Sequence, residues 1–184
     1  EVLSVASGQM LARESNVVRA VFAADGKSLA AGSRDGWVRV RSVDASVGRR
    51  LPKALPREIC SGSAAALSPD GQWMFVVGEK KSNICRTYTW EPVGKPLDGL
   101  YHDFKDAVSG AAFSPDNRLL VTSMSYRGKS ITSPSTRQVA FWDVATTSRL
   151  GELNSDSNAL SGLAFDTSGR NLRFGGFVID VRTR

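Results

Sequence analysis

The fold is decided by the stretch Ser109-Gly110-Ala111-Ala112-Phe113-Ser114-Pro115-Asp116-Asn117-Arg118-Leu119-Leu120-Val121. Two apolar runs flank a Ser-Pro-Asp-Asn segment, and Asp-Asn, like Asp-Gly, tolerates the positive φ angles of tight hairpin turns. A polar loop is expected over 124–137, and the apolar run Val139–Val144 follows it. The pattern predicts strand, turn, strand, loop, strand. Such a unit cannot bury both of its apolar faces alone, so copies of it must stack on either side.

The turn recurs along the chain. Its four copies are Ala23-Ala24-Asp25-Gly26, Ser68-Pro69-Asp70-Gly71, Ser114-Pro115-Asp116-Asn117 and Asp166-Thr167-Ser168-Gly169. Their last residues, at 26, 71, 117 and 169, lie 45, 46 and 52 residues apart. A period of about 40 to 45 residues with strand-only character is typical of the blades of a β-propeller.

In these features the chain resembles the WD40-repeat family, in the bacterial type of repeat. The residues that carry the resemblance are the Phe-Ser-Pro-Asp type turns, the pair Trp142-Asp143 and its variant Trp90-Glu91. The resemblance implies an all-β, WD40-like β-propeller of about four blades of antiparallel strands, forming an open arc of a larger propeller. The expected units are a partial blade over 1–16 and blades over about 17–57, 58–101, 102–154 and 155–184.

The resemblance also implies structural roles for single residues. In the family, an aspartate in a hairpin turn, a histidine, a hydroxyl and a tryptophan form a buried hydrogen-bonded network. Asp35 matches the aspartate, but Arg41 stands at the tryptophan position of that copy. In the third copy His102 matches the histidine, Ser123 is expected to supply the hydroxyl, and Trp142, followed by Asp143, matches the tryptophan. His102 is therefore interpreted as structural and not catalytic.

Composition excludes several function classes. Hydrophobic residues make up 41% and charged residues 23% of the chain, as in ordinary soluble proteins, so a disordered chain is not expected.

Cys60 and Cys85 are the only cysteines and lack metal-site spacing, so both are expected to be free buried thiols, which favours a cytoplasmic location. No nucleophile–base pair, phosphate loop or metal-ligand cluster is recognised. The prediction is a non-catalytic protein without cofactor or metal.

Binding is the expected function, because a propeller presents rigid loops on its faces. The loops between second and third strands are rich in basic residues, and Tyr126 adds an aromatic side chain of the kind enriched at interface hot spots. The candidate partner-binding residues are Arg34, Lys80, Lys81, Tyr126, Arg127, Lys129 and Arg137. With Asp35 and Glu79 included, the charge of these loops is +4, within a chain of net charge +6.

Three functional hypotheses stay open. The first is a protein-interaction scaffold or sensor segment of a larger protein. The second is binding of nucleic acid or another polyanion through the basic loops, although aromatic side chains are not interleaved with them apart from Tyr126. The third is structural support for an enzyme domain outside this segment. No membrane partner is expected, and self-association is expected if the blade edges are open.

Two further structural expectations concern the second and third copies. The third strand of the second copy is predicted at Thr87–Trp90, and the loop over 124–137 is predicted to be the most mobile internal segment and a contact site. Both ends of the open arc are expected to expose apolar blade faces.

Overall fold

The computed structural model describes residues 2–3, 10–12, 17–22, 28–33, 38–42, 63–78, 81–87, 89, 91–100, 106–126, 136–155, 162–174 and 176–183. In these residues the fold is all-β apart from one short 3₁₀ helix, η1 (Val181–Thr183). The predicted fold class is confirmed.

The strands form antiparallel sheets in chain order, and we name four of them as blades. A two-stranded sheet precedes them, made of β1 (Val2–Leu3) and β2 (Met10–Ala12). Blade 1 holds β3 (Val17–Phe22), β4 (Ser28–Ser33) and β5 (Val38–Ser42). Blade 2 holds β6 (Ser63–Leu67), β7 (Trp73–Val77) and β8 (Asn83–Arg86). Blade 3 holds β9 (Asp106–Phe113), β10 (Leu119–Tyr126), β11 (Thr136–Asp143) and β12 (Arg149–Ser155). Blade 4 holds β13 (Leu163–Phe165), β14 (Asn171–Phe174) and β15 (Phe177–Asp180).

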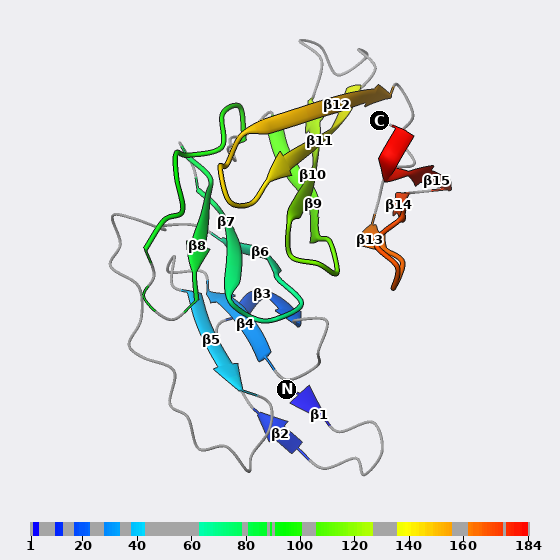
Figure 1. Cartoon of the computed structure of the whole chain (residues 1–184). Helices are drawn as coiled ribbons and strands as arrows, with labels where there is room; N and C mark the ends of the chain where they lie inside the picture. Colours follow the sequence, from blue (N-terminus) through cyan, green and yellow to red (C-terminus); the bar gives the residue numbers. More distant parts are fainter. Residues whose placement is uncertain are drawn as a thin grey trace, which may run out of the picture.

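The blades stack through their first strands, as in a propeller. Strand β3 contacts β6, β6 contacts β9, and β9 contacts β13. Figure 1 shows the resulting row of sheets, with the β1–β2 pair at one end and blade 4 at the other. Small residues at these strands permit the close approach. A Cβ atom added at Gly110 would lie 3.1 Å from Ser123 Oγ and 3.7 Å from a methyl carbon of Leu163 in the next blade.

Two apolar clusters lie between the blades. Phe75, Ile84 and Leu97 of the second copy pack with Leu120, Trp142 and other residues of blade 3. Val121, Val139 and Phe141, on the other face of blade 3, pack with Leu172, Phe174 and Val181. Successive side chains of a strand point to opposite faces, so blade 3 is buried on both sides. Blade 3 is therefore stacked on both sides, as the burial of its two apolar faces requires.

The recurring turn is held by its own side chains. Ser114 Oγ donates to a carboxylate oxygen of Asp116 and accepts from the N–H of Leu119, and the Asp116 carboxylate accepts from the N–H of Arg118. The equivalent bonds of Ser68 and Asp70 form in blade 2. Only the last turn residue has a positive φ, as at Asn117 (62°). The loop thus spans the five residues 114–118 between strands and is longer than the tight hairpin turn that the sequence suggested.

Neighbouring turns also touch each other. The N–H of Asp70 donates to Asn117 Oδ1 at 3.4 Å, which connects the turns of blades 2 and 3. A Cβ added at Gly169 would lie 3.2 Å from Pro115, so the turns of blades 3 and 4 are close as well. The turns therefore form one continuous surface along the row of blades.

Two predictions were wrong, one on a strand of blade 2 and one on a loop of blade 3. The third strand of blade 2 is Asn83–Arg86 and not Thr87–Trp90, because the chain leaves the sheet at Thr87, whose hydroxyl binds the carbonyl of Gly71 at 2.6 Å. The predicted loop over 124–137 is shorter, because strand pairing continues to Tyr126 opposite Thr136. Its remaining part, 127–135, lies outside the described residues, as do most of the connections that would fix the predicted blade limits.

Candidate interaction faces

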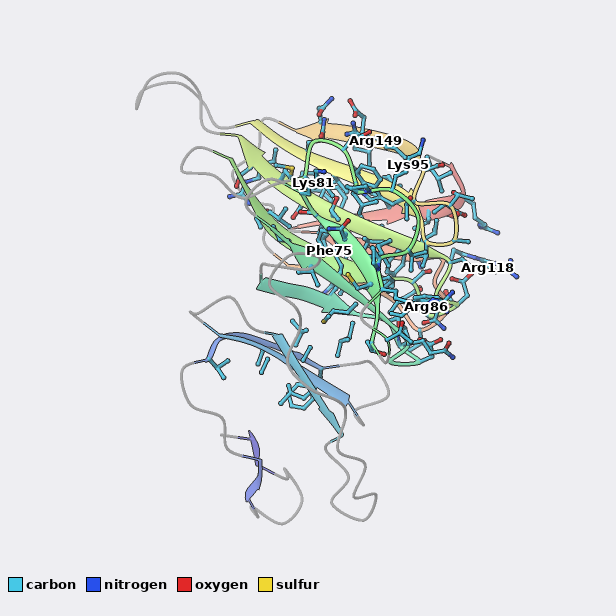
Figure 2. All side chains as sticks on the ribbon, turned by 90° about the vertical axis from the view of Figure 1, so that its left-hand side faces the viewer. Phe75, Lys81, Arg86, Lys95, Arg118 and Arg149 are labelled. Carbon is cyan, nitrogen blue, oxygen red and sulfur yellow. The ribbon has the colours of Figure 1, made fainter. Side chains whose placement is uncertain are left out.

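The strand ends define two faces of the row of blades. We call the turn face the one formed by 68–72, 114–118, 144–148 and 166–170. We call the loop face the opposite one, where β7 leads to β8 and β10 leads to β11. Figure 2 shows Arg86 and Arg118 near the turn face and Lys81 away from them, toward the other strand ends.

Three of the candidate binding residues predicted from the sequence are among the described residues of the loop face. Lys81 is exposed and directly precedes the β8 region, while Arg137 is half-buried near the start of β11. Tyr126 ends β10 and pairs with Thr136. The structure thus brings Lys81, Tyr126 and Arg137 to the same ends of two adjacent blades. The other candidates lie outside the described residues: Arg34, Lys80, Arg127 and Lys129.

The turn face carries carboxylates that are occupied by hydrogen bonds within the turns. The hydroxyl of Ser114, together with the N–H and charge of Arg118, lowers the pKa of Asp116 below its usual value, against a smaller effect of burial. The hydroxyl and N–H of Thr146, both 2.7 Å from Asp143 Oδ1, lower the pKa of Asp143 in the same way. These carboxylates shape the turns and are already engaged.

One hydrogen bond of the network predicted for blade 3 is described, and it involves a different hydroxyl. The indole N–H of Trp142 donates to the hydroxyl of Thr122 at 3.0 Å, and both side chains are buried. Thr122 therefore supplies the hydroxyl. The sequence prediction, which gave this role to Ser123, was wrong. Ser123 points to the other face of its strand, where its hydroxyl lies 2.9 Å from that of Ser109. His102 and Asp35 lie outside the described residues.

Strand register assigns the tryptophan place of blade 2 to Cys85. Cys85 pairs with Met74, as Trp142 pairs with Leu120 one blade later. The pair equivalent to Trp142-Asp143 in blade 2 is thus Cys85-Arg86. The sequence prediction, Trp90-Glu91, placed this pair five residues too far toward the C-terminus, and Trp90 lies outside the described residues. Cys85 is fully buried and disulfide-bonded, so the prediction of free thiols was wrong for it.

The structure adds two arginine–tryptophan contacts that the sequence did not reveal. The guanidinium of Arg86 lies over the ring of Trp73, 4.8 Å from its centroid, and that of Arg149 lies 5.6 Å from the ring of Trp142. Trp73 and Arg86 are register partners on neighbouring strands. A correct strand assignment for β8 would have predicted their contact.

Among the described residues, no group of three or more His, Cys, Asp and Glu side chains is arranged to hold a metal ion. The same part of the chain contains no helix with the length and apolarity needed to span a membrane.

Comparisons with known proteins agree with this geometry. The family described as WD domain, G-beta repeat matches residues 6–42 and 94–143. The solved structure of U3-55K is similar over 79% of this chain, with a TM-score of 0.55 and 20% identity. The crystal structure of the RRP9 WD40 repeats is similar over 85%, with a TM-score of 0.56 and 20% identity. The chain covers 41% and 43% of those two chains. No curated protein matches significantly.

Two separate regions of the chain match the WD40-repeat family, and the chain shares its fold with solved WD40 structures. WD40 repeats generally mediate protein interactions and scaffolding, which is the coarser part of the function predicted from the sequence.

Proposed function

We propose that the chain is a protein-interaction scaffold or sensor segment of a larger protein and binds a protein partner through its loop face. The blades supply a rigid frame, because both faces of blade 3 are buried against neighbours. Loops held by such a frame are the usual place of binding residues.

The observation that favours the loop face is the contrast between the two faces. On the turn face, Asp116 and Asp143 are bound to hydroxyls and N–H groups of their own turns. On the loop face, blades 2 and 3 bring Lys81 and Tyr126 to adjacent strand ends, and Lys81 is exposed. Tyr126 and Arg137, which lie at the ends of the paired strands β10 and β11, are of the residue types enriched at protein interfaces.

Polyanion binding is the second candidate, and the basic residues of the loops are the observation that favours it. It predicts that affinity for a heparin fragment or a single-stranded oligonucleotide falls steeply and log-linearly with salt concentration. Binding that depends on buried contacts with a protein would change much less with salt. Support for an enzyme domain elsewhere in the parent protein is a third candidate.

Photo-cross-linking tests the proposal. A benzoylphenylalanine residue is placed at Lys81 in one variant and at Arg118 in a matched variant, since both side chains are exposed but lie on opposite faces. We expect the Lys81 variant to cross-link to a discrete protein in an extract of the source cells, and the Arg118 variant to give far less product. Equal cross-linking at both positions would contradict a loop-face site. Products with nucleic acid alone would favour the polyanion candidate.

A further inference from the structure

The hairpin of β14 and β15, whose connection lies on the loop face, is shorter than its equivalent in blade 3. Pairing of β14 with β15 ends at Phe174 opposite Phe177. Counted from the recurring turn, the equivalent pair in blade 3 is Thr122 opposite Ala140. Strands β10 and β11 continue beyond it for four more register pairs. At about 3.3 Å per residue, blade 3 extends about 13 Å further toward the loop face. Figure 1 shows the short β14 and β15 beside blade 3.

Phe177 is exposed at this difference in height, on the side of blade 4 that faces blade 3. Its register partner Phe174 belongs to the apolar cluster shared with blade 3, and the two ring centroids are 5.7 Å apart. Register partners point to the same side of a sheet. Phe177 is nevertheless 50% exposed, whereas its equivalent Ala140 is 2% exposed. The exposure therefore arises beside a neighbouring blade that is present.

Blade 3 presents polar side chains above this ring. Ser125 and Arg137 are register partners on the same side of the sheet as Val139, which belongs to the cluster shared with blade 4. Both side chains are half-buried. Among the described side chains of this seam between Val139 and the loop face, only Arg137 is charged. We call the arrangement of Phe177 below Ser125 and Arg137 the step.

We propose that the step is the docking site of an extended segment of the protein partner. A large apolar side chain of that segment packs on Phe177, and a carboxylate lies opposite Arg137. The inference rests on the function proposed above and gives the chemistry of the partner. An exposed aromatic ring rimmed by polar groups is typical of interaction sites. A guanidinium forms its strongest hydrogen bonds with carboxylates, so the charge of Arg137 favours an acidic segment.

A phage-displayed library of short random peptides supplies the probe. We expect the selected peptides to contain a large apolar residue within a few positions of Asp or Glu. One such peptide, labelled with fluorescein, is titrated with the chain and followed by fluorescence anisotropy. Phe177→Ser should weaken its binding by on the order of tenfold or more. The matched control is Leu150→Ser, because Leu150 is also 50% exposed but lies on β12, outside the step.

The charge is tested by a double-mutant cycle. Arg137→Gln should weaken binding of the selected peptide by about fivefold to tenfold. Replacing the acidic residue of the peptide by its amide should weaken binding to the unmodified chain to a similar extent. The two changes together should cost no more than one alone, because both remove the same ion pair.

A third readout leaves the side chains of the step almost unchanged. A 4-fluorophenylalanine residue is placed at Phe177 in one sample and at Phe22 in a matched sample, since Phe22 is 52% exposed but lies on β3. Addition of the peptide should shift the fluorine resonance at Phe177 and leave the resonance at Phe22 in place.

The outcomes separate the step from the function on which it rests. A peptide that Lys81→Glu weakens and Phe177→Ser does not, with no fluorine shift at Phe177, would overturn the step and leave a loop-face site standing. A peptide that only Arg118→Glu weakens would contradict both, because Arg118 lies on the turn face. A library that yields no peptide weakened by Phe177→Ser would also overturn the step.

Discussion

The indole N–H of Trp142 and the hydroxyl of Thr122 form a buried hydrogen bond of 3.0 Å between two adjacent strands of blade 3. The ring of Trp142, on β11, faces blade 2. The bond to Thr122 of β10 holds this ring within the apolar cluster between blades 2 and 3. Its loss would leave a buried donor without an acceptor.

Thr122→Val should therefore destabilise the chain by about 1–3 kcal/mol, because it keeps the volume and removes the acceptor. Thr122→Ser, which keeps the hydroxyl, should cost less. Urea unfolding followed by tryptophan fluorescence measures the difference. Equal unfolding midpoints for the valine and serine variants would show that the bond has no net effect.

Ser114 gives a second prediction, for the turn. Its hydroxyl accepts from the N–H of Leu119 and donates to Asp116. Ser114→Ala should cost about 1 kcal/mol of stability and raise the pKa of Asp116 toward its usual value, because the main cause of its depression is removed. Carboxyl titration by NMR reports the pKa. An unchanged Asp116 titration in this variant would contradict the assigned cause.

Asp180 gives a prediction for acid. The guanidinium and N–H of Arg182 lower its pKa to about 2. Since the folded-state pKa lies below the unfolded one, this contribution to stability is present above about pH 4 and is lost as the pH falls toward about 2. In Arg182→Gln the NMR midpoint of Asp180 should move upward. A midpoint near 4 in the unmodified chain would rule out the ion pair in solution.

Cys85 gives a prediction that the sequence would not have made. Cys60 is the only other cysteine in the chain and lies outside the described residues. We expect the denatured chain to resist thiol alkylation until a reductant is added, and reduction to lower the stability by about 2–4 kcal/mol. Alkylation of both cysteines without reductant would contradict an intramolecular disulfide. The prediction of a cytoplasmic location rested on free thiols, and a disulfide removes that support.

The sequence predicted the fold well because the turn is encoded locally. Asp116 and Asn117 suit their positions through their own hydrogen bonds and backbone preferences, so the repeat was visible without any long-range information. The third strand of blade 2 was misplaced for the opposite reason. Nothing in the sequence around Cys85 marks it as the equivalent of Trp142. Only its pairing with Met74 on the neighbouring strand shows that it occupies this position.

The candidate site was less predictable. Adjacent hydroxyls at Thr122 and Ser123 differ only in which face of β10 they occupy, and a one-residue change of register exchanges these faces.

Successive blades stack through their first strands, and the contact between β9 and β13 tests this stacking most directly. Gly110 of β9 faces Leu163 of β13, at a separation that leaves a methyl carbon of Leu163 3.7 Å from a Cβ placed on Gly110. We predict a strong nuclear Overhauser cross-peak between the Gly110 α protons and a Leu163 methyl group. Absence of that cross-peak, in a spectrum that retains the cross-strand peaks of Leu120 with Phe113, would show that the blades form without stacking.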